Sequence, residues 1–338
     1  MVGGSESGRS WYPSRVDRPR VHWSDCPELC DHRHWRAERA RRSLFNSRGE
    51  SGVSAVAKQS ERTPLAAFVV ALIMIVFHIG ALGAVFTGLS PVAAGVALAL
   101  YLVRGFGVTA GFHRLLAHRS FQTSRPVQFL LALSGSLAIQ GGPLWWVAHH
   151  RSHHRDTDTA EDIHSPTTQG FWHSHMGWMM SAAAFHEQGS NARDLHRYPE
   201  IKFLQRHYVA LLVLQAVVLY ALGAVLDWLA PGLGTSGAQM LVWGLFVSTV
   251  ALWHATFMVN SVCHIWGGRP NATGDDSTNN AFVALFALGE GWHNNHHAFP
   301  FSARHGLRWY QFDLTWVILR LMEKCRLVSN LRLPRGEA

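Results

Sequence analysis

Two long stretches without charged side chains dominate the pattern of hydrophobic and polar positions. Residues 63–103 contain no Lys, Arg, Asp or Glu, and Asp227 is the only charged residue in 207–268. Each stretch is long enough for two membrane-crossing helices of about 20 residues. Turn-forming residues divide the stretches near Gly88 and near Pro231. The pattern therefore predicts four spans, at about residues 66–87, 91–110, 208–229 and 237–258.

The charges at the ends of these spans predict their orientation. Neither turn carries Lys or Arg, whereas every other flank is basic. Because Lys and Arg concentrate on the cytosolic side of a membrane, we expect both turns outside, and both termini and residues 104–206 in the cytosol. The predicted fold is an all-α integral membrane protein, with four transmembrane helices as two hairpins and a cytosolic helical cap. Charge-free stretches of this length disfavour the alternative, a soluble protein with a buried helical core.

Residues 127–148 are ambiguous, because they are apolar enough to suggest a fifth span. A crossing there would place the histidines before and after the segment on opposite sides of the membrane. We therefore interpret it as a helix that lies at the interface or is buried against the cytosolic domain.

The two ends of the chain differ from this central part. Residues 1–62 are rich in Arg, Ser, Gly, Glu and Asp and lack apolar periodicity, which predicts a largely disordered, basic cytosolic tail with a short helix around 33–45. Residues 63–325 are predicted to form the membrane domain, and 326–338 a C-terminal tail.

Composition agrees with a membrane protein. Hydrophobic residues make up 48% of the 338 residues and charged residues only 15%, which is low for a soluble protein. A net charge of +8 first suggests a protein that binds nucleic acid. Membrane topology explains the blocks of basic residues better, so we expect no nucleic-acid partner. The four cysteines are scattered and form no disulfide framework.

Three clusters of histidine carry the candidate chemistry. Their members are His113 and His118; His150, His153 and His154; and His293, His296 and His297. In the second and third clusters the spacing is i, i+3 and i+4, so on a helix three imidazoles share one face. One metal rarely needs three ligands from one segment, whereas two metals beside the same face do. Imidazole is a general ligand for iron, zinc and copper.

A ninth candidate is His264, which follows the fourth predicted span and has Asn260 one turn before it. Nine imidazoles fit two metals with four or five ligands each, and they exceed the needs of one tetrahedral zinc site. His113 and His118 are five residues apart and diverge by about 140° on a regular helix. Either the helix ends between them or they reach different metals.

Other polar residues beside the clusters could orient the ligands. His149 lies outside the repeated spacing, and we interpret it as a residue behind the ligands. Glu290 stands between two glycines that allow close backbone approach, and its carboxylate could orient a ligand imidazole. Four acidic residues after the middle cluster are either acceptors for ligand imidazoles or part of a solvated loop: Asp156, Asp158, Glu161 and Asp162.

The spacings H-x4-H at 113–118, H-x2-H-H at 150–154 and H-x2-H-H at 293–297 resemble the three histidine boxes of the integral-membrane fatty acyl desaturases. The likeness covers about residues 64–325. Three longer phrases resemble the Δ9 acyl-CoA desaturase branch: Thr109-Ala-Gly-Phe-His-Arg, Asn260-Ser-Val-Cys-His and Gly289-Glu-Gly-Trp-His-Asn-Asn-His-His-Ala-Phe-Pro.

The resemblance implies an oxidoreductase that uses O2 and two electrons to introduce a cis double bond, at Δ9, into a saturated acyl chain. It implies two iron ions on the cytosolic side of four spans, with the nine histidines as ligands and Asn260 holding a metal-bound water. Removing hydrogens from an unactivated methylene needs an oxidant stronger than any side chain, so a dioxygen-activating metal centre must supply it.

The acyl carrier and the electron donor are less defined. Residues 177–185 lack the basic pair that the animal members place near the CoA phosphates, so the carrier is CoA or another group. The sequence contains no haem module, no dinucleotide-binding glycine motif and no cysteine set for an iron–sulfur cluster. We therefore expect a separate donor, such as a ferredoxin with its NAD(P)H reductase.

Arginines near the boxes bear on how that donor docks. They predict a basic cytosolic face that attracts an acidic carrier. Alternatively, they only fix the topology and contact lipid phosphates. The arginines are Arg104, Arg114, Arg119, Arg125, Arg151, Arg155, Arg304 and Arg308.

Three rival functions are weighed against this prediction. A histidine-box hydroxylase of alkyl, sterol or carotenoid substrates shares the ligands but inserts oxygen. A divalent-metal transporter places polar ligands near the middle of its spans, and the spans here are almost free of charge. A lipid-binding scaffold leaves the nine histidines without a role.

Overall fold

The computed structural model describes residues 52–185 and 189–335, and residues 49–338 form one compact unit. The described chain is mostly helical, as predicted. Its only strands are β1 (Gln122–Thr123) and β2 (Val328–Ser329), which pair antiparallel. Residues 1–51, with the short helix expected around 33–45, lie outside the described ranges.

Four helical segments in the described ranges are long and apolar enough to cross a membrane, as predicted: Pro64–Thr87, Pro91–Ala117, Tyr208–Leu229 and Gly237–His264. Their elements are α2 (Gly52–Leu82) and α3 (Ala84–Thr87); α4 (Pro91–Phe106) and η2 (Gly107–Ala117); α10 (Tyr208–Leu229); and α11 (Gly237–Leu241), η7 (Val242–Val247), α12 (Ser248–Ser261) and η8 (Val262–His264). The second and fourth segments continue beyond the predicted ends at 110 and 258, directly into the histidine motifs. Residues 52–62, expected in the tail, are helical.

Polar residues at the two predicted turns set where the next helices begin. The hydroxyl of Ser90 accepts a hydrogen bond from the Ala93 N–H at 3.1 Å, and Pro91 takes the first helical position of α4. The hydroxyl of Ser236 likewise accepts from the Gln239 N–H at 3.2 Å at the start of α11. Such caps satisfy backbone donors that a helix start leaves free.

Residues 127–148 form two helices rather than a fifth span. α5 (Arg125–Ser136) and α6 (Pro143–Asp156) are separated by residues 137–142, and neither is among the candidate spans. α5 crosses η2 at close range, because a Cβ on Gly107 would lie 2.1 Å from the backbone nitrogen of Gly135. Only glycine permits this crossing. The segment is therefore packed against the second span.

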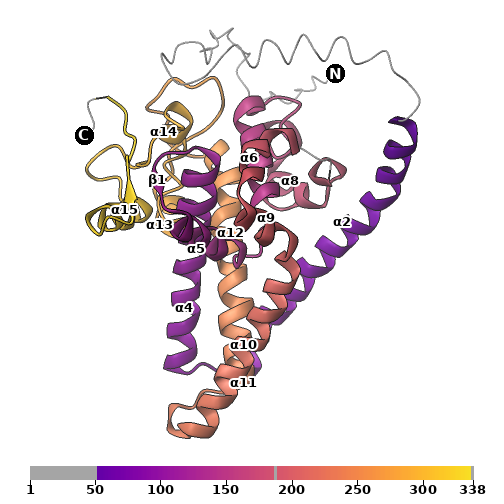
Figure 1. Ribbon diagram of the computed structural model, residues 1–338, viewed down its shortest axis with the longest axis vertical. Helices are drawn as coiled ribbons and strands as arrows, with labels where there is room; N and C mark the ends of the chain where they lie inside the picture. The colour runs from indigo at the N-terminus through magenta and orange to yellow at the C-terminus, as the bar shows by residue number, and fades with distance from the viewer. Residues whose placement is uncertain (1–51, 186–188, 336–338) are drawn as a thin grey trace, which may run out of the picture. The chain divides into compact units, whose positions relative to one another are not determined.

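Short helices complete the segment between the second and third spans: α7 (Pro166–Gln169), α8 (Phe171–His175), η3 (Gly177–Met180), η4 (Ala182–Phe185), η5 (Gly189–Arg197) and α9 (Pro199–Arg206). The link between α10 and α11 is η6 (Pro231–Leu233). After the fourth span come α13 (Ala281–Phe286), α14 (His293–Ala298) and α15 (Leu314–Lys324). Figure 1 shows α6, α8 and α14 near the upper ends of the spans, at the opposite end from the link between α10 and α11.

Part of residues 326–338, which we expect to form a C-terminal tail, contacts the preceding chain. Besides the pairing of β2 with β1, the Arg332 N–H donates to the carbonyl of Ser120 at 2.8 Å, and the Ala303 N–H donates to the carbonyl of Arg332 at 2.8 Å. Residues 328–332 thus join the end of the second span to the segment after α14.

A buried arginine ties three of the spans together. Arg104 on α4 has no exposed surface. Its guanidinium donates to Gln215 Oε1 on α10 at 2.8 Å and to Ser248 Oγ on α12 at 2.7 Å. A cation inside a membrane segment needs such partners, because lipid offers none. Arg104 therefore does not contribute to a basic surface. The prediction from the sequence, which included Arg104 in such a surface, is wrong for this residue.

Candidate metal centre

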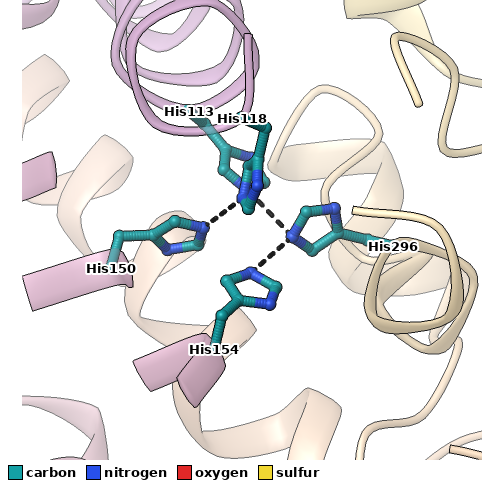
Figure 2. A group of neighbouring side chains, drawn as sticks. All are labelled: His113, His118, His150, His154 and His296. Carbon is teal, nitrogen blue, oxygen red and sulfur yellow. Dashed lines mark hydrogen bonds between the residues drawn. The ribbon is translucent and has the colours of Figure 1, made fainter. Parts of the chain in front are cut away.

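Five of the nine predicted histidines come together in one group. His113 and His118 at the end of the second span face His150 and His154 of α6 and His296 of α14 (Figure 2), and their ligand nitrogens lie within 4.8 Å of one another. The Nε2 atoms of His118 and His150 are 2.7 Å apart. His296 Nε2 lies 3.0 Å from that of His113 and 2.8 Å from that of His154. We call this set group one.

A π-helix explains how His113 and His118 reach the same group. In η2 the His118 N–H donates to the carbonyl of His113 at 3.1 Å, which is the i to i+5 pattern. Residues five apart therefore lie on one face, and the two rings are 4.9 Å apart. The π-helix ends at Ala117, between the two histidines, as the first alternative has it, and the two histidines lie in one group rather than in different ones.

The other four predicted histidines form group two: His153, His264, His293 and His297, whose ligand nitrogens also lie within 4.8 Å of one another. The Nε2 atoms of His264 and His293 are 3.0 Å apart. α6 and α14 each contribute to both groups, since neighbouring residues on each helix belong to different groups. The rings of His154 and His297, from different groups, are only 4.6 Å apart. The two groups are thus adjacent.

In four ligand candidates, the Nδ1 atom lies within hydrogen-bonding distance of a carboxylate. Three of them belong to group two: the Nδ1–H of His153 donates to Asp162, that of His264 to Asp158 and that of His297 to Asp275, at 2.8–2.9 Å. In group one, His113 Nδ1 lies 2.6 Å from Glu290 Oε2. A proton fixed on Nδ1 leaves the Nε2 lone pair free for a metal and makes the imidazole more basic.

These carboxylates are ionised although they are buried. Burial alone raises the pKa of Asp158, but hydrogen bonding from His264 outweighs it and lowers that pKa to about 2. The same balance holds the pKa of Asp162 beside His153 and that of Asp275 beside His297 far below their usual values. The three negative charges surround group two, which suits a cation at its centre.

Most ligand candidates are held in the neutral form. Five of the ligand candidates outside the spans have a pKa well below the usual value, because they are buried and lie beside other imidazoles. They are His118, His150, His154, His293 and His296. Burial also opposes charge on His153, but the carboxylate of Asp162 outweighs burial and raises that pKa. Neutral imidazole is the form that binds metals.

Both groups fit metal ions rather than a network of hydrogen bonds alone. His296 Nε2 faces two other ring nitrogens, His113 Nε2 at 3.0 Å and His154 Nε2 at 2.8 Å, yet with one hydrogen or one lone pair it can hydrogen-bond to only one of them. The buried Nε2 atom of His297 has no hydrogen-bond partner at all. Buried polar atoms without partners are costly, and a cation at the centre of each group would satisfy them.

Glu290 anchors a second buried network behind group one. Its Oε1 accepts hydrogen bonds from Arg114, whose guanidinium also donates to Asp313 at 3.0 Å. His305 Nδ1 lies 3.2 Å from Glu290 Oε2. The approach depends on glycine, since a Cβ on Gly289, at φ +109°, would lie 2.3 Å from Asp313 Oδ1. The expected role of Glu290 beside a ligand imidazole agrees with this geometry.

Two other predicted residues lie apart from the ligand nitrogens. The Nδ1 of His149 bonds to the carbonyl of Trp145 at 2.8 Å, and its ring packs against Trp145 and Trp178 rather than against a member of either group. Asn260 accepts a hydrogen bond at its backbone oxygen from Ser174. Its predicted role, holding a metal-bound water, stays a prediction.

Sequence reasoning missed several residues of the site. Asp275, which is partly buried, and His305, which is buried, lie beside ligand candidates but belong to none of the histidine motifs. His164 packs on His153 with ring centres 4.4 Å apart. Asp158, for which the sequence leaves open an acceptor for a ligand imidazole or a solvated loop, accepts a hydrogen bond from His264 Nδ1 at 2.9 Å. Only the folded loops bring these residues to the ligands, so no spacing in the sequence marks them.

The predicted basic docking face is wrong for Arg104 and Arg114, and it stays a prediction for the other arginines around the first two boxes. Arg114, like Arg104, has no exposed surface. The others form ion pairs: Arg119 and Arg151 with Asp194, Arg125 with Glu200, and Arg155 with Asp156. Because Asp194 pairs with both Arg119 and Arg151, three carboxylates balance the positive charge of these four arginines only in part.

Replacing Asp275 with Asn should weaken metal binding at group two by about 10- to 100-fold, because the amide keeps the shape but loses the charge that fixes His297. Metal retained against increasing chelator measures the effect. Asp276→Asn is the matched control, since the neighbouring Asp276, whose side chain is 47% exposed, pairs with Arg269 and with none of the ligand candidates. Equal metal retention in the two variants would show that Asp275 does not support the metal.

The model of the fatty acid desaturase family matches residues 87–327. Icosanoyl-CoA 5-desaturase of Limnanthes douglasii is 45% identical over 232 residues, covering 68% of this chain and 61% of that protein. Palmitoyl-monogalactosyldiacylglycerol delta-7 desaturase of Arabidopsis thaliana is 42% identical over 246 residues, covering 72% and 62%. The sn-1 stearoyl-lipid 9-desaturase of Anabaena variabilis is 43% identical over 259 residues, covering 76% and 90%. The match thus spans less than two thirds of the first two relatives and most of the third.

Proposed function

Because this chain belongs to the fatty acid desaturase family, we propose that it is an O2-dependent oxidoreductase that introduces a cis double bond into a saturated acyl chain. We assign the bond to Δ9. Of the three relatives above, the one covered most fully is by name a 9-desaturase, whereas the other two are named for positions 5 and 7. The carrier of the acyl chain is CoA or a lipid, since the relatives' names include both.

The observation that carries this proposal is the pair of adjacent, buried groups of five and four imidazoles. We assign one iron ion to each group, because imidazole-rich ligation suits iron and nine ligands exceed one site. Bound there, the two irons would activate O2 to the oxidant that removes hydrogens from an unactivated methylene.

The protein's own residues hold and shield this centre. Group one is fixed by η2, α6 and α14, and group two by α6, α14 and η8. Four carboxylates orient ligand rings through their Nδ1–H groups. Members of both groups are buried, for example His113 and His296 of group one and His264 and His293 of group two. Exclusion of water protects a strong oxidant from side reactions.

We further propose the membrane topology that the charges favour: two helical hairpins whose turns face outward, with both termini and the di-iron cap in the cytosol. It is supported by the absence of Lys and Arg from residues 88–90 and 230–236 and by the basic residues at the opposite ends of the spans. Electrons then come from a separate cytosolic donor, such as a ferredoxin with its NAD(P)H reductase.

Expression in a strain supplied with saturated acyl chains tests the proposal. We expect products that have lost two hydrogen atoms and carry one cis double bond, located by fragmentation at Δ9. A product that has gained one oxygen atom would instead make the protein a hydroxylase. Unchanged acyl chains, in cells where the protein is present in the membrane and loaded with iron, would reject the function altogether.

A further inference from the structure

Helix α14 contributes to both groups, yet it is too short to be stable alone. It has six residues, and no side chain caps its N-terminus. Isolated helices need about 12–15 residues to form even marginally in water. His293 and His297 belong to group two, whereas His296 belongs to group one. Contacts with the rest of the chain must therefore fix both the position and the rotation of α14.

Two asparagines, Asn294 and Asn295, lie between these histidines in the sequence. At about 100° per residue, they are on the opposite side of the helix from the three imidazoles. Both are buried, with exposed fractions of 0% and 4%. A buried amide without partners is costly, and each side-chain amide offers two donor hydrogens and an oxygen with two lone pairs. The partners of these amides therefore show what holds the helix.

Asn294 connects α14 to the loop that carries Asp275. Its Oδ1 accepts from the Asn271 N–H at 2.9 Å, and its Nδ2 donates to the Asn271 carbonyl and to Thr273 Oγ1, both at 3.2 Å. The Thr273 hydroxyl donates to Asp275 Oδ1 at 2.9 Å, and Asp275 Oδ2 accepts from His297 Nδ1 at 2.8 Å. The hydrogen bonds thus run from Asn294 through this loop to a ligand candidate of group two.

Asn295 connects the same helix to a segment beside group one. Its Nδ2 donates to the carbonyl of His305 at 2.8 Å and to Gln311 Oε1 at 2.9 Å. The His305 ring packs on that of His296, with ring centres 4.5 Å apart. Asn295 therefore holds the residue that lies against a ligand candidate of group one.

The two asparagines share one neighbour, Asn271. The Nδ2 of Asn271 donates to Asn295 Oδ1 at 2.9 Å, and the Nδ2 of Asn279 donates to the same oxygen at 2.8 Å. All four hydrogen-bonding positions of the Asn295 amide are thus occupied. The path to Asp275, however, starts at Thr273, which bonds to Asn294.

We propose that Asn294 and Asn295 are positioning residues for different metals, Asn294 for the metal of group two and Asn295 for that of group one. The inference rests on the proposed function, because it concerns the two metals assigned there. Metal sites need ligand distances within about 0.2 Å of their ideal values, so a small rotation of α14 weakens binding. Separate anchors on one helix let the two sites be held independently.

Metal release separates the two roles. Purified full-length protein is loaded with iron(II) without O2 and titrated with a chelator, and the iron retained per chain is measured. In His153→Ala, which should keep only the metal of group one, Asn295→Ala should lower the chelator concentration needed for release by ~10-fold. Asn294→Ala should leave that concentration unchanged. In His296→Ala, which should keep only the metal of group two, the two effects should be exchanged.

This exchange of effects distinguishes positioning from structural support. A structural role alone would weaken both metals equally, or would only lower the unfolding temperature. Asn280→Ala is the matched control, because the Asn280 side chain accepts from the Val283 N–H at 3.1 Å and donates to the Trp266 carbonyl at 3.0 Å. Its loss should lower the unfolding temperature and leave metal release unchanged.

Asn294→Asp and Asn295→Asp test the same point should the alanine variants fail to fold, because an ionised Asp has the shape of Asn but no donor hydrogens. Separate effects on the two metals, in a protein that makes no alkene, would uphold the inference and reject the proposed function. Equal effects of both substitutions in each background, or no effect in either, would overturn the inference. A wild-type chain that binds a single ion would overturn it as well.

Discussion

Replacing His296 with Ala should abolish turnover while the protein still inserts into the membrane. His296 Nε2 faces both His113 and His154, at 3.0 and 2.8 Å, so its loss opens the middle of group one. With one of five ligands gone and a gap in a buried site, we expect the bound metal to fall from about two ions per chain to about one. Product formation and metal content, measured on the same purified samples, give both results.

The second group should be equally indispensable. His153→Ala removes a ligand of group two, and because the two metals act jointly on O2, this variant should also lose all turnover while group one keeps its metal. His207→Ala is the control, since His207 is exposed and belongs to neither group. Activity retained in His296→Ala or His153→Ala would remove that residue from the ligands.

Replacing Arg114 with Leu should strongly destabilise the protein. Arg114 is fully buried and bonds to Glu290, to Asp313 and to the carbonyl of Ala303 at 2.8 Å. Its loss leaves two buried carboxylates without their cation, which costs about 3–5 kcal/mol. A lower unfolding temperature in detergent, with less metal bound beside Glu290, is the expected result.

Arg125→Leu is the matched control for this change. Arg125 also forms an ion pair, with Glu200, but its side chain is 60% exposed, and such pairs contribute only about 0–1 kcal/mol. Equal stability of the two variants would mean that the network around Arg114 does not hold the site together. Arg114→Lys should recover part of the loss, because it restores the charge but not the forked geometry.

The spans were predictable because the bilayer imposes a simple rule on composition. Charge-free stretches located all four, and the third matched its predicted bounds of 208 and 229. The resemblance to histidine boxes selected the nine histidines that the structure brings into two groups. In both cases the information lies in residues close together in the sequence.

What could not be predicted depends on contacts between distant residues or on a local departure from α-helix. Regular helical geometry separates His113 from His118, and only the π-helix unites them. Asp275 reaches His297 from a loop 22 residues earlier. Arg104 and Arg114 read as basic flanks, but their partners lie more than 100 residues away. The sequence gives no sign of those partners, so these arginines appeared exposed.

Metal content of the purified protein tests the central claim most directly. Two adjacent groups of histidines, one with five and one with four ligand nitrogens, predict about two iron ions per chain in protein from iron-replete cells. His296→Ala and His153→Ala should each retain about one ion, and His207→Ala about two. A single metal ion per wild-type chain, or zinc in place of iron, would contradict the account.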